Sequence, residues 1–398
     1  MRTADIIALE NRYVLQSYSR APLVLERGNG VYLFDTDGNR YLDCVSGLAV
    51  NAFGYGDYEL LAAMQEQAAK LIHVSNIFHT VPSVLLAREL VERSFADRAF
   101  FCNSGTEAWE AALKFSRKWG NTTFAKPKFR FIAMHNSFHG RTLGSISTTG
   151  QPKYHQGFQP LLGGIDFADF NDLASVERLV TDETCAILVE PLQAEGGIHL
   201  ATPEFMQGLR QLCDSRGMLL VFDEIQVGLG RTGTLWAHQP YGVEPDLMTL
   251  AKALGGGLPI GVTLLRQKVA DAIKPGDHAS TFGANAVTCA TALAVMRKLT
   301  EEGFLAGVRD RGEHLVERLQ ALQQRFPGQL KQVRGRGLIL GMVTERPAAD
   351  YVAAFRERHI LVAVAGPQVV RFLPPLVMAT EQLDEVVDVF GDIVQALA

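Results

Sequence analysis

An acid and a lysine, each placed directly after an apolar segment, are the residues of this sequence best suited to chemistry. Asp223 follows the apolar run 218–222, and Lys252 follows the run 247–251 and stands before the glycines 255–257. Short apolar runs of this kind are typical of buried strands. A lysine at the end of one strand can hold the aldehyde of pyridoxal phosphate covalently, and an acid at the end of another can pair with its ring nitrogen. Either residue alone is more typical of a turn or a solvated loop, but the pair predicts a pyridoxal-phosphate site.

A competing motif lies within the same stretch. Residues 228–233, Gly-Leu-Gly-Arg-Thr-Gly, match the G-x-G-x-x-G pattern of dinucleotide sites. That pattern works only where a strand turns directly into a helix. Here residues 223–227 intervene, and 234–240 have no helical periodicity and end in a proline. A nicotinamide-dependent oxidoreductase is therefore the alternative from a different class, and the sequence disfavours it.

Two further segments could hold the phosphate and the ring of such a cofactor. Ser104 and Glu107 follow the apolar run 99–102 with the spacing of a capping box, which predicts the start of a helix. The free N–H groups of a helix N-terminus suit a phosphate, and Gly105 and Thr106 stand there. Phe138, after the run 129–134, could cover a flat ring, and Arg141 could grip a carboxylate through two parallel bonds. An ordinary helix start, a core aromatic and a surface arginine are the simpler interpretations of the same residues. His139, between the last two, fits a structural role as well as a catalytic one.

Together these segments resemble the class III, ω-amino-acid aminotransferases of fold type I. The matching stretches occur in family order over most of the chain; they are 103–108 (NSGTEA), 137–142 (SFHGRT), 190–191 (EP), 195–197 (EGG), 223–233 (DEIQVGLGRTG), 250–252 (LAK) and 281–283 (TFG). Within the family, the motifs are most similar to those of enzymes that act on N2-acetylornithine. The resemblance implies an exchange of amino groups between acetylornithine and 2-oxoglutarate, which yields N-acetylglutamate semialdehyde and glutamate in arginine biosynthesis.

The resemblance also assigns roles to individual residues. Lys252 would bond to pyridoxal phosphate and act as the catalytic base and acid, and Asp223 would pair with the ring nitrogen. The remaining cofactor contacts would come from Gln226 on the ring oxygen, Phe138 on the ring face, Gly105 and Thr106 on the phosphate, and Thr281 on the phosphate of the neighbouring subunit. Arg141 and Ser280 would contact acetylornithine. The active unit would therefore be a homodimer with shared active sites, and no metal is implied.

One site must then accept two different molecules. We hypothesise that Arg141 takes the distal carboxylate of either substrate, that Arg371 takes the α-carboxylate of glutamate, and that Glu195 neutralises Arg371 when acetylornithine is bound. An unpaired buried charge would otherwise be costly. An ordinary structural ion pair between Glu195 and Arg371 is the alternative.

The sequence departs from the family pattern in three places. Residues 284–287 (ANAV) stand where relatives carry Gly-Asn-Pro, 54–58 (GYGDY) replace a Gly-His-x-His-Pro stretch, and Ala194 replaces a glycine. The first two bear on the identity of the substrate. Succinylornithine, acetyl-lysine, ornithine or 4-aminobutyrate are therefore alternative amine donors, and a racemase or a decarboxylase on the same fold is a further alternative. A non-catalytic member would be expected to lack Lys252 or Asp223, and both are present.

The composition of the chain limits which partners and which location we expect. The chain has 398 residues and a net charge of −5, which gives no reason to expect nucleic-acid binding. Its five cysteines are scattered without C-x-x-C spacing, which favours reduced thiols and disfavours a zinc site. The N-terminus does not read as a secretory signal, and no apolar run approaches the ~20 residues of a membrane helix. We therefore expect a cytoplasmic protein that acts on small molecules and does not bind a membrane.

The elements that position these residues read as an α/β fold. Apolar runs at 99–102, 129–134, 186–189, 218–222 and 261–265 alternate with helical patterns, which predicts a mostly parallel sheet with helices on both faces. Residues 30–42 predict a hairpin with its turn at Asp37-Gly38, and short strands are expected near 337–340 and 369–372, with a last helix from about Glu381. The predicted domains are 1–54 (first part of a small domain), 55–286 (large cofactor-binding domain) and 287–398 (second part of the small domain).

Overall fold

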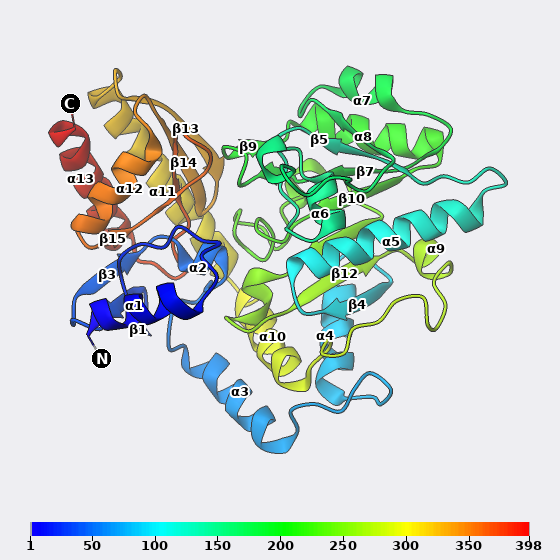
Figure 1. Cartoon of the computed structure of the whole chain (residues 1–398), viewed down its shortest axis with the longest axis horizontal. Helices are drawn as coiled ribbons and strands as arrows, with labels where there is room; N and C mark the ends of the chain where they lie inside the picture. Colours follow the sequence, from blue (N-terminus) through cyan, green and yellow to red (C-terminus); the bar gives the residue numbers. More distant parts are fainter. Residues whose placement is uncertain (1, 398) are drawn as a thin grey trace.

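A seven-stranded, mostly parallel sheet forms the centre of the larger part of the molecule in the computed structural model (Figure 1), which describes residues 2–397. Only β12 runs antiparallel, and it does so to both of its neighbours. In spatial order the strands are β4 (Arg98–Cys102), β12 (Gly261–Leu265), β11 (Leu247–Leu250), β10 (Leu219–Asp223), β7 (Thr184–Val189), β5 (Arg130–Met134) and β6 (Ile165–Ala168). The predicted α/β fold with a mostly parallel sheet is confirmed.

Helices cover both faces of this sheet because its central strands are apolar on both sides. Side chains such as Phe131, Leu188 and Val221 pack with Trp109 and Phe115 of α5, whereas Ile132, Val189 and Phe222 pack into the core on the other face. The helices of this part are α3 (Tyr58–Lys70), α4 (Val81–Glu92), α5 (Gly105–Thr123), α6 (Leu143–Thr148), α7 (Leu173–Leu179), α8 (Pro203–Arg216), α9 (Gln267–Ala270) and α10 (Ala286–Leu299). The near-continuous burial of β7, β10, β11 and β12 accounts for their unbroken apolar sequences.

The two ends of the chain come together in a second, smaller region. Ile360 and Leu361 of β15 pair in parallel with Leu42 and Asp43 of β3, which joins a sheet of N-terminal strands to the C-terminal part of the chain. Figure 1 shows the blue N-terminal elements beside the orange and red C-terminal ones. The N-terminal elements are α1 (Thr3–Tyr13), β1 (Leu25–Asn29), β2 (Tyr32–Asp35), β3 (Arg40–Asp43) and α2 (Ser46–Ala49). The C-terminal ones are α11 (Phe304–Arg325), β13 (Leu330–Arg336), β14 (Ile339–Thr344), α12 (Ala348–Glu357), β15 (Ile360–Leu361), β16 (Ala363–Val364), β17 (Val369–Phe372) and α13 (Thr380–Ala396).

Most of the sequence-predicted elements are present. The hairpin over 30–42 is formed by β2 and β3, and the last helix begins at Thr380. The strand expected at 337–340 is displaced, because Gly337 takes a left-handed φ of 58° in the turn between β13 and β14, and β14 begins only at Ile339. Strand β6 was not predicted. The domain boundaries at 54/55 and 286/287 stay predictions, and their outer ends, residues 1 and 398, lie outside the described residues.

Three further observations concern the chemistry of the chain. Within residues 2–397, no helix is both long and apolar enough to cross a membrane. In the same range, no group of three or more His, Cys, Asp or Glu side chains is placed to hold a metal ion. All five cysteines are buried free thiols.

Candidate active site

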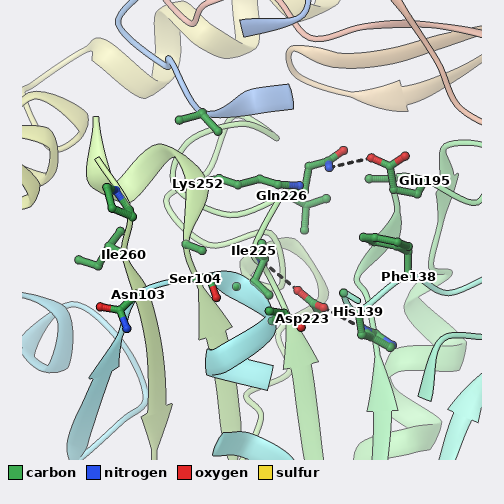
Figure 2. Close-up of a pocket in the computed structure, with 18 of the residues that line it drawn as sticks. Asn103, Ser104, Phe138, His139, Glu195, Asp223, Ile225, Gln226, Lys252 and Ile260 are labelled. Carbon is green, nitrogen blue, oxygen red and sulfur yellow. Dashed lines mark hydrogen bonds and ion pairs between the residues drawn. The ribbon is translucent and has the colours of Figure 1, made fainter. Parts of the chain in front are cut away.

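The carboxyl ends of the parallel strands meet at a cavity of about 420 Å³ (Figure 2), a volume in the range of small-molecule sites. In open α/β sheets, ligands bind at this edge. Seven of the predicted site residues line the cavity: Gly105, Thr106, Phe138, Glu195, Asp223, Gln226 and Lys252. Residues from five separate stretches of sequence are thus brought to one place.

Lys252 follows β11 at the start of the short helix η3 (Lys252–Gly255). Its backbone has a positive φ of 44°, which is strained for a residue with a side chain. Burial lowers the pKa of the ammonium to about 8, although the carboxylates of Glu195, Asp223 and Glu190 act in the opposite direction. A lysine with this pKa is uncharged in roughly a tenth of the molecules at pH 7, far more than an ordinary lysine. Lys252 is therefore prepared to act as a nucleophile and a base.

Asp223 is held rigidly at the end of β10. One carboxylate oxygen, Oδ2, lies 2.7 Å from His139 Nδ1, and Oδ1 accepts a 3.0 Å bond from the Ile225 N–H. Because the carboxylate can only accept, the imidazole donates through Nδ1. The imidazole ring stacks on Trp109 with 3.9 Å between ring centroids, and the Trp109 Nε1–H is fixed by Thr148 Oγ1 at 2.8 Å. A buried chain of contacts thus orients the one acid expected to face the cofactor ring.

The N-terminus of α5 lies at the cavity, where the sequence predicts a phosphate cradle. The N–H groups of Glu107 and Ala108 donate to Ser104 Oγ (3.3 Å) and Ser104 O (3.0 Å), which leaves those of Gly105 and Thr106 without an acceptor in the described chain. A side chain on Gly105 would bring its Cβ within 2.8 Å of Ile225, so only glycine keeps the cradle open. The predicted helix cap is confirmed, but Glu107 reaches back to the N–H of Asn103 rather than to that of Ser104.

Phe138 is held by a carboxyl group that sequence reasoning did not assign. Glu190 follows β7, and its Oε1 and Oε2 accept bonds from the N–H groups of Phe138 (3.0 Å) and Ala194 (3.4 Å). Burial raises the pKa of Glu190 well above its usual value, and the nearby charge of Asp223 raises it further. Phe222 of β10 pairs with Val189 of β7. Asp223 and Glu190 are the next residues after this pair, so they lie side by side at the same edge of the sheet. The position of Glu190 just after an apolar run was the available signal.

Glu195, Gln226 and Arg371 form one hydrogen-bonded group. Arg371 Nη1 lies 2.7 Å from Glu195 Oε1 and 2.9 Å from Gln226 Oε1, and the Gln226 amide donates to Glu195 at 3.1 Å. Burial raises the pKa of Glu195, but the charge of Arg371 and its hydrogen bonds outweigh this and hold the pKa below its usual value. The Arg371 side chain is only 2% exposed, whereas that of Glu195 is 25% exposed. The predicted pairing of Glu195 with Arg371 is therefore present, and its substrate-switching role stays a prediction.

Four predicted site residues do not line this cavity; one of them, Arg371, lies beside it and contacts the lining residues Glu195 and Gln226. Arg141 is exposed in the loop before α6, with its guanidinium over the ring of Tyr154. Ser280 and Thr281 line a separate cavity of about 380 Å³, which shares Asn103 with the first. Asn103 Nδ2 donates to Ser280 Oγ at 3.1 Å, so this loop is anchored beside the site.

The glycine-rich motif has a structural role. Residues 228–233 form turns that lead into no helix before the short η2 (Gln239–Tyr241), so the context of a dinucleotide site is missing. The buried carboxylate of Glu224 accepts bonds from the N–H groups of Ala237 and His238, and Arg231 donates to the carbonyls of Leu338 and Pro374. The motif therefore connects the large sheet to the C-terminal region.

The chemistry of this donor set fits pyridoxal phosphate. The cavity offers an amine of lowered pKa, an oriented carboxylate, two helix N–H groups without acceptors and an aromatic ring at its wall. These are the groups that an aldehyde, a ring nitrogen, a phosphate and a flat ring require.

Comparison with known proteins agrees with this fit. The chain matches the family Aminotransferase class-III over residues 13–394. It is 43% identical to an acetylornithine aminotransferase of Methanocaldococcus jannaschii (99% of this chain, 98% of the relative). It is 44% identical to a succinylornithine transaminase of Yersinia pseudotuberculosis (94% and 93%).

A solved structure agrees as well. The chain superposes on the ornithine aminotransferase of Toxoplasma gondii with a TM-score of 0.95 at 31% identity, covering 99% of this chain and 94% of that one, and that structure has pyridoxal phosphate at partial occupancy in its active site. Both the sequence and the fold therefore match one family over almost their whole length. The chain belongs to the class III aminotransferases, and its cofactor is pyridoxal phosphate.

Proposed function

We propose that this enzyme transfers the terminal amino group of N2-acetylornithine to 2-oxoglutarate, giving N-acetylglutamate semialdehyde and glutamate. The observation that carries the proposal is the buried Arg371 beside the cavity, paired with the more exposed Glu195. Such a pair suits a site that must bind a carboxylate next to the reacting carbon in one half-reaction. In the other half-reaction no substrate carboxylate is present there, and Glu195 keeps the buried charge of Arg371 from being unpaired. The high identity to acetylornithine aminotransferases supports the choice of amine donor.

The cofactor would be held by residues from several elements. Gly105 and Thr106 N–H groups would bind the phosphate, Phe138 would cover the ring and Asp223 would pair with the ring nitrogen. When bound, pyridoxal phosphate supplies an aldehyde that exchanges with amino groups and a ring that accepts the electron pair left when the substrate carbon loses a proton. Asp223 favours the charged form of the ring nitrogen because His139 and the Ile225 N–H hold its carboxylate in place.

Lys252 would move the proton. Its lowered pKa of about 8 lets the amine accept a proton from the substrate carbon and return it nearby without a large energetic cost in either direction. Gln226 would donate an amide N–H to the ring oxygen; one of its two N–H donors is bonded to Glu195, and the other is available for this contact.

The carboxylates of the two substrates would be sorted by two arginines. Arg371 is fixed by Ala194 O at 3.1 Å and by Gln226, and its buried Nε has no hydrogen-bond partner within residues 2–397. Because Glu195 is the more exposed partner, it is the member that would turn aside when glutamate presents its α-carboxylate. Arg141 would take the distal carboxylate of both substrates.

The proposal includes a homodimer in the cytoplasm, with Thr281 completing the phosphate site of the other subunit. Large apolar side chains are exposed around the Thr281 loop, among them Ile72, Ile77, Phe78, Val81 and Phe282. Asn76 Nδ2 donates to the carbonyls of Ser280 and Gly283, so the segment near residue 76 and the Thr281 loop form one surface. An apolar surface of this kind is typical of a subunit interface.

A panel of amine donors assayed with 2-oxoglutarate tests the proposal. Acetylornithine should give the highest kcat/KM, ahead of succinylornithine, acetyl-lysine, ornithine and 4-aminobutyrate. The name of the Yersinia relative makes succinylornithine the second candidate. A higher kcat/KM for succinylornithine than for acetylornithine would reverse the assignment.

A further inference from the structure

Arg141 lies on an aromatic platform made by Tyr154. Its guanidinium carbon is 4.0 Å from the centroid of the Tyr154 ring and 5.6 Å from that of the Phe138 ring. The two rings are themselves in edge contact, with 5.6 Å between centroids and 72° between planes. Tyr154 therefore connects the aromatic that lines the cavity with the arginine outside it.

The guanidinium lies over the Tyr154 ring, a contact that uses none of its N–H donors. No hydrogen bond or ion pair engages the Arg141 side chain within residues 2–397, so its N–H donors are available. A guanidinium recognises a carboxylate through two parallel N–H bonds in its own plane, and stacking on a ring restricts that plane without using the donors. A flexible, exposed arginine would otherwise lose rotational freedom each time it bound a substrate.

The platform is tied to the loop that carries Phe138. Tyr154 ends the short helix η1 (Pro152–Tyr154), and the neighbouring Gln151 donates from Nε2 to the carbonyls of Asn136 (3.3 Å) and Ser137 (3.2 Å). The backbone N–H of Tyr154 also donates to the carbonyl oxygen of Gln151 at 3.0 Å. The ring under Arg141 is thus fixed relative to the cavity wall.

We propose that Tyr154 is a positioning residue for the binding of substrate carboxylates: its ring face orients the guanidinium of Arg141 toward the distal carboxylate of the substrate. This inference rests on the role of Arg141 in the proposed function. Because both acetylornithine and 2-oxoglutarate carry a distal carboxylate, Tyr154 contributes to the binding of both.

Tyr154→Leu, which removes the ring face, and Tyr154→Phe, which keeps it, test the inference in the enzyme loaded with its cofactor. Tyr154→Leu should raise KM for acetylornithine and for 2-oxoglutarate by about threefold to tenfold with a smaller change in kcat, and Tyr154→Phe should stay within about twofold of the wild type. Calorimetry with glutarate, an unreactive dicarboxylate, should show the same increase in Kd for Tyr154→Leu. Phe326→Leu is the matched control, because Phe326 also lies under an arginine, Arg325 at 5.4 Å, but stands at the end of α11 in the C-terminal region, whereas Tyr154 contacts the cavity residue Phe138.

The outcomes separate this inference from the proposed function. If wild-type enzyme does not turn over acetylornithine, the substrate assignment fails, and glutarate binding still tests Tyr154. If Arg141→Ala weakens glutarate binding but Tyr154→Leu does not, the platform role is overturned. Equal effects of Tyr154→Phe and Tyr154→Leu would also overturn it, since the hydroxyl and not the ring face would then matter. In an Arg141→Ala background, Tyr154→Leu should add nothing further.

Discussion

His139 Nδ1 and Asp223 Oδ2 are 2.7 Å apart in a buried contact, and the imidazole is stacked on Trp109. The same pair of residue types occurs at the same 2.7 Å distance between His314 and Asp384, where both side chains are about a third exposed. The contact is thus made twice in one chain, once buried at the cavity wall and once on the surface, which provides an internal control.

We predict that His139→Phe will weaken cofactor binding and destabilise the fold. Phenylalanine keeps the stack on Trp109 but removes the N–H that Asp223 accepts, so a buried carboxylate loses a partner. The free energy of unfolding should fall by about 1–3 kcal/mol, and the Kd for pyridoxal phosphate should rise about tenfold, as a loss of ~1.4 kcal/mol would give. Urea unfolding and fluorescence titration measure the two effects. His314→Phe should cost less than about 1 kcal/mol, since its ion pair is solvent-exposed, and equal losses from both variants would contradict the role of burial.

Lys252 should make the cofactor-free enzyme more stable as pH rises. Its pKa in the folded chain is lowered to about 8 from 10.5, so between these values the unfolded chain binds a proton that the folded chain has lost. The free energy of unfolding contributed by this group is therefore lowest below pH 8 and increases up to about pH 10.5. Lys252→Met should be more stable than wild type by about 1–3 kcal/mol at pH 7, and the difference should shrink toward pH 10. A constant difference across pH 7–10 in chemical unfolding would contradict a lowered pKa. Lys252→Met and Lys252→Ala should both lack transaminase activity but still fold and bind the cofactor.

We predict that replacing Ala284 with glycine will stabilise the fold. Ala284 occupies a left-handed conformation with φ 61° just before α10, a conformation that favours glycine. A residue with a side chain costs about 1–2 kcal/mol in this left-handed backbone conformation. Glycine removes that cost, but its greater conformational entropy in the unfolded chain offsets about 0.4–1 kcal/mol of the gain. Ala284→Gly should therefore stabilise the fold by about 0.5–1 kcal/mol in thermal or urea unfolding. The control is Ala286→Gly in the first turn of α10, which should destabilise by about 1 kcal/mol.

Thr281 should act in the active site of the partner subunit. Thr281→Ala should weaken cofactor retention several-fold, as measured by dialysis and absorbance. When Lys252→Ala and Thr281→Ala subunits are mixed and reassembled, a shared site places both defects in one site of each hybrid dimer and leaves the other intact. Roughly a quarter of all sites should then recover wild-type turnover. Recovery of no activity in verified hybrids, or full activity of a dilute monomer in sedimentation, would show that Thr281 serves its own subunit or none.

The strands and their catalytic ends were accessible from sequence because buried parallel strands are apolar throughout and the residues that follow them meet at one edge. This is why Asp223, Lys252 and Phe138 could be placed together from the sequence. Glu190 was not assigned, because its partners are backbone N–H groups of Phe138 and Ala194, which carry no side-chain signal.

The contacts between aromatic and charged side chains depended on tertiary packing. Trp109 lies on a helix and His139 in a loop thirty residues away, and nothing in their spacing predicts a 3.9 Å stack. Likewise, the sequence separates Arg141 from Tyr154 by a whole helix, α6, which returns the chain to the same place. Helix α5 was predictable from its cap, but the Glu107 contact shifted by one residue, because the extended backbone of Ser104 presents the Asn103 N–H to that carboxylate.

Arg371→Ala should separate the two half-reactions of the enzyme. If Arg371 binds the α-carboxylate of glutamate, the glutamate and 2-oxoglutarate half-reaction should slow most, because removing one partner of a buried charge pair costs ~2–5 kcal/mol, or tenfold for each ~1.4 kcal/mol. The acetylornithine half-reaction should lose less, since that substrate places no carboxylate there, but it should not be spared, because Glu195 is left without its 2.7 Å partner.

Glu195→Gln is the complementary variant. It leaves Arg371 charged and unneutralised, so it should slow the acetylornithine half-reaction more than the glutamate one. Single-turnover absorbance spectra of each half-reaction measure both variants. Equal slowing of the two half-reactions by both substitutions would reduce Glu195 and Arg371 to a structural ion pair, whereas opposite asymmetries would establish that the pair selects between the two substrates.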